Sequence, residues 1–457
     1  MAALRWYQLE YRCGNDSCRY SANIRHKRPF IITGDKLENN KCYGCNKLTL
    51  SAKLKHTTAV QIELQDSDNP NEIDRLTCYL FEQNTKGLKV GETVIIDGNI
   101  CVINKNDNRK HKFIPALYGN SIFYENREEL LLTEEDKQTI KSLYQHYSEN
   151  AKNNKSWIDF LVSIFAPNIA RNYNPKLGIL LAAASSGPDE VYRHRDRIHV
   201  ILVGEPGLAK SVLIFDGTLL VSNSRYMSMS NTSGISLTAM IEKDEIGGGY
   251  NLRIGSIPLA KNSIFGANEI GELNFKNQLY LGDIMEEGVA NVSKYTIDAD
   301  IIAPVTMISA CNPSGTNWKF DNHIELTEIP LPLKELDRYD LPFFLRMPRD
   351  PRLLKEFAQE ITKCERENPL PIDYTFLQKV ILYSKTFRPK LSDKAIEDIE
   401  EAWVKFVQIR GSIRVKDILV RLAKAFARLK LKSIADTEDA DDAIELYSQV
   451  MYNTTAS

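Results

Sequence analysis

Residues 198–211 read Ile-His-Val-Ile-Leu-Val-Gly-Glu-Pro-Gly-Leu-Ala-Lys-Ser. The first six residues are typical of a buried strand, and the last eight follow the pattern of a phosphate-binding loop that opens a helix. Gly204, Lys210 and Ser211 match G-x-x-x-x-G-K-[ST], whereas Ala209 stands where the second glycine is usual. The stretch therefore predicts an α/β P-loop domain that binds a nucleoside triphosphate.

The composition is that of an ordinary globular chain. Its 457 residues suffice for two or three domains, and 43% hydrophobic with 26% charged residues is typical of soluble proteins. No run approaches the roughly 20 apolar residues that span a bilayer, and the amino terminus has no secretory pattern. We therefore expect an intracellular protein without membrane association. Its eight cysteines should stay reduced unless they bind metal.

The net charge of −2 hides a basic amino-terminal region. Residues 1–55 carry eleven Lys and Arg against four Asp and Glu, and a second basic cluster runs from Lys105 to Lys112. A charge run is often only a solvated surface. Two such segments in one region favour a polyanion as partner.

Four cysteines near the amino terminus have the spacing of a zinc ribbon. Cys13 and Cys18 form one pair, and Cys42 and Cys45 form a C-x-x-C pair 24 positions later. Each pair suits a tight turn, and four thiolates complete a tetrahedron around Zn²⁺ with no open position for chemistry. We predict a structural zinc site within about residues 10–50. Four unrelated thiols, or a disulfide, are the alternatives.

Apolar and polar residues alternate along short segments of residues 57–124, as they do in short strands. Val60–Gln65, Leu76–Phe81 and a turn and strand over Val90–Gly98 suit a small barrel of the OB type. Val102–Ile114 is apolar at both ends and basic in the middle, as a hairpin with a cationic tip would be. Its candidate phosphate-binding residues are Lys105, Arg109, Lys110 and Lys112.

A polar connector follows the strands. Thr133 with the acids after it predicts a helix start, and apolar helices are expected at Trp157–Ile164 and Lys176–Ala184. We place the boundary near residue 150. The predicted organisation is a zinc-ribbon and OB-type domain at residues 1–125, a linker at 126–155, an α/β P-loop core at 156–350 and a helical lid at 351–457.

Four further segments follow the P-loop in order. They are Ser263–Ile270, Val305–Pro313, Leu336–Leu341 and Ile413–Ala423. An NTP site needs a carboxylate for water, a polar group at the γ-phosphate and arginines for the transferring charge. Glu269, Asn312, Arg338 and Arg414 supply these groups in that order.

Taken together and in this order after the P-loop, these segments resemble the minichromosome-maintenance (MCM) replicative helicases, which are AAA+ ATPases. The resemblance covers nearly the whole chain and indicates a shortened, divergent, archaeal-type member. Gly204–Ser211 with its alanine, Ala310–Pro313 and Asp337–Asp340 carry it most specifically. Gly288–Ile297 and Glu242–Leu259 resemble two hairpins of the family.

The resemblance implies ATP-driven unwinding of duplex DNA by a hexameric ring that moves 3′ to 5′ on single-stranded DNA. Lys210 would neutralise the phosphates, Ser211 would bind Mg²⁺, Glu269 would activate water and Asn312 would sense the γ-phosphate. Arg338 and Arg414 would reach the ATP of a neighbouring subunit. The implied nucleotide-binding residues are Gly204, Glu205, Pro206, Gly207, Leu208, Ala209, Lys210, Ser211, Val212 and Asn268.

Lys294 falls where the family places a DNA-contacting lysine, although it is also one lysine among many. The implied cofactors are ATP, Mg²⁺ and Zn²⁺. The implied partners are single-stranded and forked DNA, further copies of the chain in a homohexamer, and other replication proteins.

The sequence also departs from the family. Asn268 replaces a Mg²⁺-linked aspartate, and Gly266 with Ala267 makes the preceding strand a poor one. We predict ATP binding with slowed hydrolysis, or hydrolysis rescued by Glu272. No helical subdomain precedes the zinc ribbon and no winged helix follows the lid, as in a reduced member or an engineered truncation.

Three functions therefore compete. An active helicase is favoured by Lys210, Glu269, Arg338 and Arg414. An ATP- and DNA-binding ring with weak hydrolysis is favoured by Asn268. A different AAA+ machine is disfavoured by the zinc ribbon and barrel.

Overall fold

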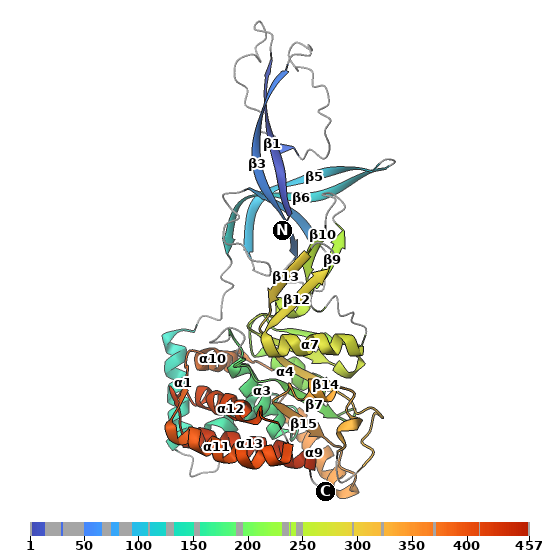
Figure 1. The fold of residues 1–457 in the computed structure, drawn as a ribbon. Helices are drawn as coiled ribbons and strands as arrows, with labels where there is room; N and C mark the ends of the chain where they lie inside the picture. The colour runs from blue at the N-terminus through green and yellow to red at the C-terminus, as the bar shows by residue number, and fades with distance from the viewer. Residues whose placement is uncertain are drawn as a thin grey trace. The chain divides into compact units, whose positions relative to one another are not determined.

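A computed structural model gives the fold (Figure 1). The structure describes residues 2–13, 29–30, 50–65, 75–81, 94–107, 110–124, 132–149, 156–188, 195–230, 237, 239–243, 250–294, 297–320, 324–368, 372–410 and 412–455. Its contacts divide the chain into two compact units. The first holds Met1–Arg127 with Met240–Arg253 and Lys294–Ile297, and the second holds the remainder.

The first unit contains a six-stranded sheet in the order β2-β1-β3-β4-β6-β5. Its strands are β1 (Ala2–Cys13), β2 (Pro29–Phe30), β3 (Leu50–Gln65), β4 (Arg75–Phe81), β5 (Val94–Asp107) and β6 (Lys110–Tyr124). All neighbouring pairs are antiparallel except β4 with β6. Cys78, Leu80 and Leu117 are buried against one another. β3 and β4 include the predicted strands Val60–Gln65 and Leu76–Phe81, and β5 pairs antiparallel with β6, whereas the OB-type barrel and the zinc ribbon stay predictions.

The second unit is built on a five-stranded sheet in the order β15-β7-β14-β11-β8. The strands are β7 (Val200–Gly204), β8 (Arg225–Ser228), β11 (Ile264–Asn268), β14 (Thr306–Cys311) and β15 (Leu341–Leu345). All neighbours pair in parallel, so the five carboxyl ends share one edge of the sheet. β7 and β14 are buried throughout, as continuous apolar runs in a covered parallel sheet must be.

Several helices of the described part of the chain contact this sheet, among them the following two. α3 (Tyr173–Ser185) contacts β7, β14 and β15, and α4 (Lys210–Leu219) contacts β11 and β14. α3 also contacts the lid helices α10 and α12, so it lies between the sheet and the lid. This position explains why α3 is apolar around most of its circumference, since almost every residue from Pro175 to Ser185 is buried.

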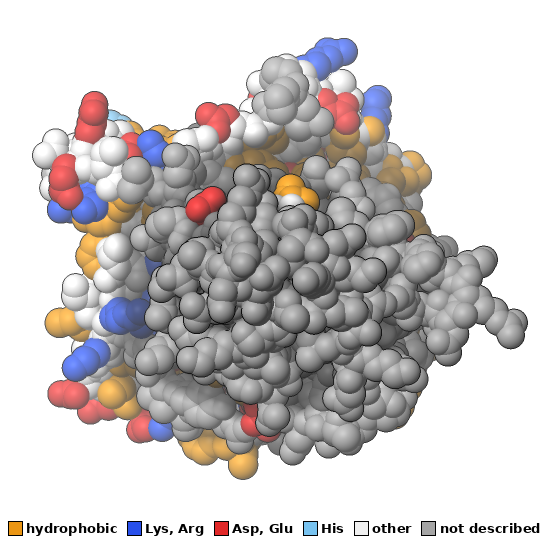
Figure 2. Space-filling view, turned by 90° about the horizontal axis from the view of Figure 1, so that it is seen from above, with side chains coloured by type: hydrophobic (Ala, Val, Ile, Leu, Met, Phe, Trp, Pro, Cys, Tyr) orange, Lys and Arg blue, Asp and Glu red, His pale blue; other side chains and the backbone are white. Residues whose placement is uncertain are grey.

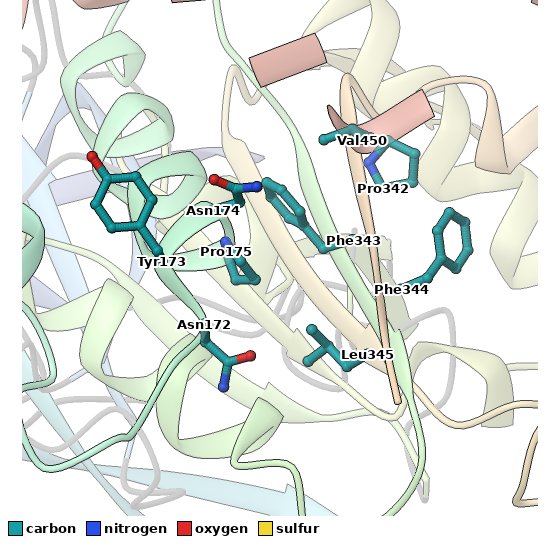
Figure 3. Close-up of a pocket in the computed structure, with 9 residues that line it drawn as sticks. All are labelled: Asn172, Tyr173, Asn174, Pro175, Pro342, Phe343, Phe344, Leu345 and Val450. Atoms are coloured by element: carbon teal, nitrogen blue, oxygen red, sulfur yellow. The ribbon is translucent and has the colours of Figure 1, made fainter. Parts of the chain in front are cut away.

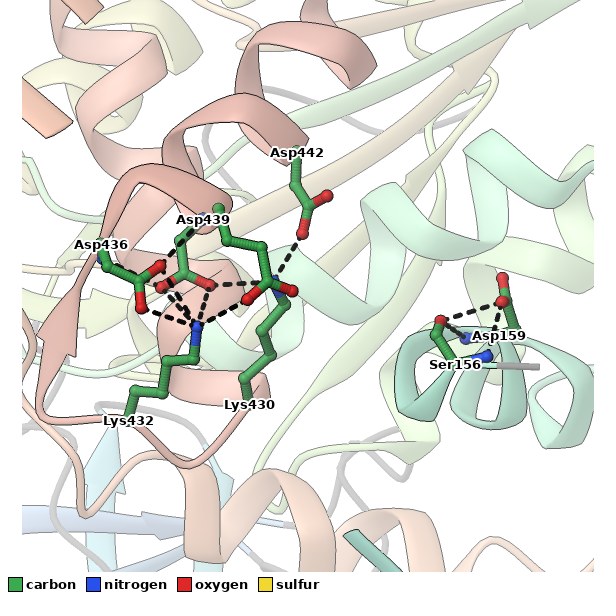
Figure 4. A network of polar contacts seen from close by, with 8 residues as sticks. Ser156, Asp159, Lys430, Lys432, Asp436, Asp439 and Asp442 are labelled. Carbon is green, nitrogen blue, oxygen red and sulfur yellow. Dashed lines mark hydrogen bonds and ion pairs between the residues drawn. The ribbon is translucent and has the colours of Figure 1, made fainter. Parts of the chain in front are cut away.

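The lid follows the core. It comprises α10 (Thr375–Ser384), α11 (Asp393–Arg410), α12 (Val415–Leu429), α13 (Thr437–Thr455) and the short pair β16 (Lys390–Leu391) and β17 (Ile434–Ala435). The turn between α12 and α13 holds an ion-pair network drawn in Figure 4. Lys430 Nζ lies 2.7 Å from Asp442 and 3.0 Å from the fully buried Asp439, and Lys432 Nζ lies 3.0 Å from Asp436. The network fixes the start of α13 against the end of α12.

The helices before the core begin where the sequence predicts. α1 (Glu134–Glu149) starts at Thr133, whose Oγ1 accepts a bond from Asp136 N at 3.1 Å. α2 (Trp157–Ile164) has a capping box in which Ser156 and Asp159 bond reciprocally (Figure 4). Asp136 also accepts a bond from Lys379 Nζ of α10 at 2.7 Å, so α1 is attached to the lid.

The remaining elements connect these parts. They are β9 (Ala239–Lys243) paired with β10 (Tyr250–Ile254), α6 (Ser256–Leu259), η3 (Ile270–Glu272), α7 (Phe275–Glu287), β12 (Val289–Lys294) paired with β13 (Ile297–Ile302), η4 (Leu326–Glu328), α8 (Leu333–Leu336) and α9 (Pro351–Glu367). Among the described residues, no helix has the length and apolar content to cross a bilayer.

The expectation of a poor strand around Gly266 is wrong. β11 forms, and it pairs with β14 on one side and β8 on the other. A Cβ at Gly266 would stand only 2.8 Å from methyl groups of Ile214 and Thr218 on α4. The small residue therefore lets the P-loop helix pack closely on the sheet.

Replacing Gly266 by Ala should destabilise the core, because overpacking a close contact costs about 1–3 kcal/mol. The measurement is the thermal midpoint of the purified chain. Gly315→Ala is the matched control, since the nearest atom to a Cβ there is 3.6 Å away. Equal midpoints for the two variants would contradict the packing argument.

Candidate nucleotide site

The P-loop continues from the carboxyl end of β7. A Cβ at Gly204 would lie 2.6 Å from the carbonyl oxygen of Leu345, so the strand can approach β15 only without a side chain there. Gly207 has φ of 81°, and Ala209 caps α4 with φ of 55°. Ala209 thus occupies the left-handed region despite its Cβ, and the loop delivers the amino-terminal N–H groups of α4 to one point.

Lys210 is the first residue of α4 and is buried. Its Nζ donates to the carbonyl oxygens of Gly204 and Glu205, each at 2.7 Å. Burial lowers the pKa of Lys210, although nearby Cys311 and Glu205 oppose the shift. The ammonium group is therefore held inside the loop by two neutral acceptors and has no anion as partner among the contacts described.

A second pair of groups lies beside the P-loop. Ser211 Oγ donates to Asn268 Oδ1 at 2.9 Å, which joins the start of α4 to the end of β11. Hydroxyl and amide oxygens are hard ligands of the kind that Mg²⁺ accepts. The structure thus brings together the two residues predicted at the metal, with the amide in place of a carboxylate.

Glu269 follows Asn268 directly and has φ of 58°, an uncommon conformation for a residue with a side chain. Its Oε2 accepts a bond from Ser228 Oγ at 2.7 Å. Ser228 ends the neighbouring strand β8 and pairs with Asn268 in register. Sequence reasoning missed Ser228, because it predicted no strand at Arg225–Ser228 and therefore no residue at the carboxyl end of that strand.

Other predicted nucleotide residues have different surroundings. Asn312 follows the end of β14 at the same edge and is exposed. Glu205 is buried, and its Oε2 accepts a bond from Met347 N at 2.8 Å, so this carboxylate braces the P-loop against the segment after β15. Pro206 is exposed, Leu208 is buried, and Val212 is 45% exposed on α4.

Arg338 and Arg414 lie at the opposite edge of the sheet. Arg338 precedes β15, whose first residue pairs with Val200 at the start of β7. A five-residue strand separates the two edges by roughly 13 Å. The two predicted arginines are therefore remote from the P-loop of their own chain.

The two arginines share one carboxylate. Glu286 Oε2 of α7 lies 3.3 Å from Arg338 Nη1 and 3.1 Å from Arg414 Nη1. Arg338 also pairs with Glu335 at 3.3 Å, whereas Asp337 lies 3.8 Å from Arg414 Nε. Arg338 is 5% exposed, and the side chain of Arg414 is 38% exposed. We call Arg338, Arg414 and Glu286 the arginine edge.

Comparison with protein-family models identifies both parts of this unit. Residues 145–365 match the MCM P-loop domain, and residues 375–451 match the MCM AAA-lid domain. The chain belongs to the MCM family. The predicted AAA+ P-loop core with a helical lid is thereby confirmed, and a P-loop core of this family implies the use of a nucleotide with Mg²⁺.

Curated MCM proteins align with most of the chain. It is 26% identical over 464 residues to DNA replication licensing factor mcm4-B of Xenopus laevis, covering 92% of the chain and 52% of that protein. It is 28% identical over 312 residues to DNA replication licensing factor MCM4 of Drosophila melanogaster, covering 64% of the chain and 36% of that protein. It is 27% identical over 334 residues to minichromosome maintenance protein MCM of Saccharolobus solfataricus, covering 70% of the chain and 47% of that protein. The chain thus spans about a third to a half of these relatives.

A pocket of this MCM chain lies along the edge strand β15, whose Leu345 pairs with Gly204 at the start of the P-loop. It has a volume of about 250 Å³ and is formed by the start of α3, the edge strand β15 and Val450 of α13 (Figure 3). Phe343 points toward Asn174, whereas Phe344 points to the other face of β15. None of the lining residues was predicted to act on a nucleotide.

The predicted DNA and zinc residues of this MCM chain are only partly described. Lys294 ends β12, next to the tip of its hairpin with β13. Lys105, Lys110 and Lys112 lie in β5 and β6, and Cys13 ends β1. Outside the described residues lie Arg109, Cys18, Cys42 and Cys45.

The described residues contain no cluster of His, Cys, Asp or Glu that could hold a metal ion. On the face drawn in Figure 2, described Lys and Arg side chains are interspersed with acidic and hydrophobic ones. The coloured residues of that face form no single basic patch.

Proposed function

We propose that this chain is an ATP-dependent DNA helicase of the MCM type, which forms a hexameric ring on single-stranded DNA and unwinds duplex DNA. The observation that carries the proposal is the separation of the P-loop from the arginine edge within one chain. Phosphoryl transfer needs both a phosphate-binding loop and arginine. Head-to-tail contact between copies brings one chain's arginine edge to the next chain's P-loop, and such contacts close into rings.

The residues at the P-loop fit ATP and Mg²⁺. Lys210 would exchange its two carbonyl partners for phosphate oxygens, and Ser211 with Asn268 would hold Mg²⁺. Mg²⁺ held by these residues would supply positive charge that offsets the charge developing on the phosphates. Glu269, oriented by Ser228 at 2.7 Å, would accept the proton of the attacking water. Asn312 would contact the γ-phosphate.

The β5–β6 hairpin supports a role in binding the DNA backbone. Lys105 and Lys112 are direct cross-strand partners, a pairing of like charges that costs stability in isolation. A phosphate between them would relieve the repulsion. We assign phosphate contacts to these residues, to Arg109 and Lys110, which lie between them in the sequence, and to Lys294 at the hairpin of β12 and β13.

We further propose that Cys13, Cys18, Cys42 and Cys45 bind a structural zinc ion. The support is their spacing in the sequence. The relatives' names place them in DNA replication. The proposed place of action is therefore chromosomal DNA, in company with other replication proteins.

Unwinding of a forked DNA tests the motor. We expect ATP hydrolysis that rises on adding DNA, and strand separation that requires ATP. The control is Lys210→Ala, which should bind DNA but separate no strands. Equal unwinding by the two proteins would refute the motor, and binding without unwinding by the unmodified chain would favour the second function below.

The second candidate is an ATP- and DNA-binding ring with weak hydrolysis. Asn268 favours it, because an amide beside Ser211 attracts a divalent ion far less than a carboxylate would.

Replacing Asn268 by Asp should raise the rate of ATP hydrolysis by about tenfold or more, since a restored anion strengthens Mg²⁺ binding by at least about 1.4 kcal/mol at a partly screened site. The measurement is the steady-state rate against Mg²⁺ concentration, with half-saturation moving to lower Mg²⁺. Asn223→Asp is the matched control, because it adds the same charge at an exposed residue just before β8, at the opposite edge of the sheet. An unchanged Mg²⁺ dependence would show that Asn268, or a neighbouring acid such as Glu272, already suffices.

A further inference from the structure

A buried ion cluster joins the lid to the core beside Arg338. The carboxylate of Asp340 is fully buried and accepts three bonds. They come from Arg195 Nη2 at 2.8 Å, Arg421 Nη2 at 2.6 Å and the backbone N–H of His199 at 2.8 Å. Burial alone would raise the pKa of Asp340, but the two guanidinium groups outweigh it and hold the pKa at about 2. The carboxylate is therefore ionised at neutral pH. We call Asp340, Arg195 and Arg421 the clamp.

The clamp is attached directly to the arginine edge. Arg195 Nη1 donates to the carbonyl oxygen of Arg338 at 2.7 Å, which fixes the backbone of that residue. Arg421 belongs to the lid helix α12, and its Nη1 donates to the carbonyl oxygen of Arg195 at 3.4 Å. Arg414 caps the same helix, seven residues before Arg421, which is about 10 Å along the axis. One cluster thus holds the helix that carries Arg414 and the loop that carries Arg338.

His199 extends the connection to the third member of the edge. Its Nδ1 accepts a bond from Met307 N at 2.9 Å, so its Nε2 carries the proton and donates to the carbonyl oxygen of Met285 at 3.0 Å. Met285 precedes Glu286, the carboxylate that contacts both arginines. Burial keeps the pKa of His199 well below its usual value, so the ring stays neutral in this arrangement.

We propose that Asp340 and Arg421 are positioning residues that hold Arg338 of the core and Arg414 of the lid in register, so that both reach one phosphate group of a neighbouring subunit. This inference rests on the proposed function. The clamp contacts no nucleotide in its own chain, since it lies at the amino edge of the sheet. Its effect is on the neighbour's reaction, through the relative position of the two arginines.

A buried ion pair by itself is weak evidence for stability, because desolvation offsets most of the attraction. The position of this one is what carries the inference. It joins the lid helix that carries Arg414 to the core segment that carries Arg338, and a displacement of about 1 Å at such groups lowers a rate by about 100-fold.

The experiment compares four variants of the whole chain. Arg421→Gln and Asp340→Asn should each lower the kcat of ATP hydrolysis by about 10- to 100-fold with KM for ATP little changed. Arg421→Lys should recover part of the rate, because an ammonium can still reach Asp340. Lys416→Gln is the matched control on the same helix. It breaks a 2.7 Å pair with Glu400 that lies entirely within the lid, and it should leave kcat unchanged.

Mixed assemblies separate positioning from simple damage. Arg421→Gln mixed equally with Lys210→Ala should regain activity at about a quarter of the interfaces, where an intact P-loop meets an intact arginine edge. An equal mixture of Arg338→Ala and Lys210→Ala should regain activity in the same way. Recovery in the second mixture but not the first would overturn the inference and leave the proposed function standing. Recovery in neither would overturn the proposed function. A kcat of Arg421→Gln equal to that of the unmodified chain would also overturn the inference.

Discussion

Replacing Lys210 by Ala is expected to lower the rate of ATP hydrolysis by about 10³-fold, because a unit charge about 4 Å from a phosphate at a partly buried site contributes about 4 kcal/mol. ATP should also no longer raise the thermal midpoint, since stabilisation by a ligand requires that it bind the folded state. Without ATP the midpoint should change little. The lost contacts are two bonds to carbonyl oxygens of a surface loop, at Gly204 and Glu205.

Lys176→Ala provides the matched control. Lys176 is also buried, and its Nζ also donates to two carbonyl oxygens, those of Ala166 and Ile169, at 2.9 and 2.8 Å. It has no place at the P-loop, so its loss should lower the midpoint while the shift caused by ATP persists. The measurement is the midpoint of each protein with and without MgATP. An ATP-induced shift that survives in Lys210→Ala would contradict the assignment of Lys210 to the phosphates.

The sequence predicts the nucleotide side of this site well, because its residues follow strands. The P-loop that carries Lys210 follows β7, Asn268 ends β11 and Asn312 follows β14, and parallel strands place their carboxyl ends together. The contact between Ser211 and Asn268 is the structural consequence of that rule. A strand of small residues such as β11 misleads the same reasoning, since Gly266 serves the packing of α4 and not strand propensity.

The clamp could not be predicted in this way. Arg195 and Arg421 are 226 residues apart, and nothing in their local patterns relates them to each other. Asp340 stands within a quoted motif, where only the arginine two positions earlier attracts attention. Long-range polar contacts depend on how the lid packs on the core, and that packing is set by the apolar faces of α3 and α12. The cysteines and the basic hairpin tip, in contrast, lie where sequence spacing still provides the main argument.

Replacing Arg338 by Ala is expected to reduce kcat for ATP hydrolysis by about 10³-fold or more, the range found when an arginine that stabilises phosphoryl transfer is removed. ATP affinity should change little, because Arg338 lies at the amino edge of the sheet, roughly 13 Å from the P-loop of its own chain. Arg338→Ala would therefore separate binding from turnover, whereas Lys210→Ala should lose both.

The measurement pairs equilibrium binding of a fluorescent ATP analogue with steady-state hydrolysis. A control is Arg171→Ala, which removes another arginine with an acidic partner, Glu360 at 2.6 Å, on an exposed surface. It should leave kcat within about twofold, since exposed ion pairs contribute about 1 kcal/mol or less. Loss of ATP affinity in Arg338→Ala equal to its loss of kcat would place this residue at its own chain's nucleotide.

Because Arg338 is buried against Glu335 and Glu286, Arg338→Lys tests the remaining alternative of lost packing. A lysine keeps the charge and most of the volume but not the two-pronged geometry, so kcat should stay low while the thermal midpoint recovers.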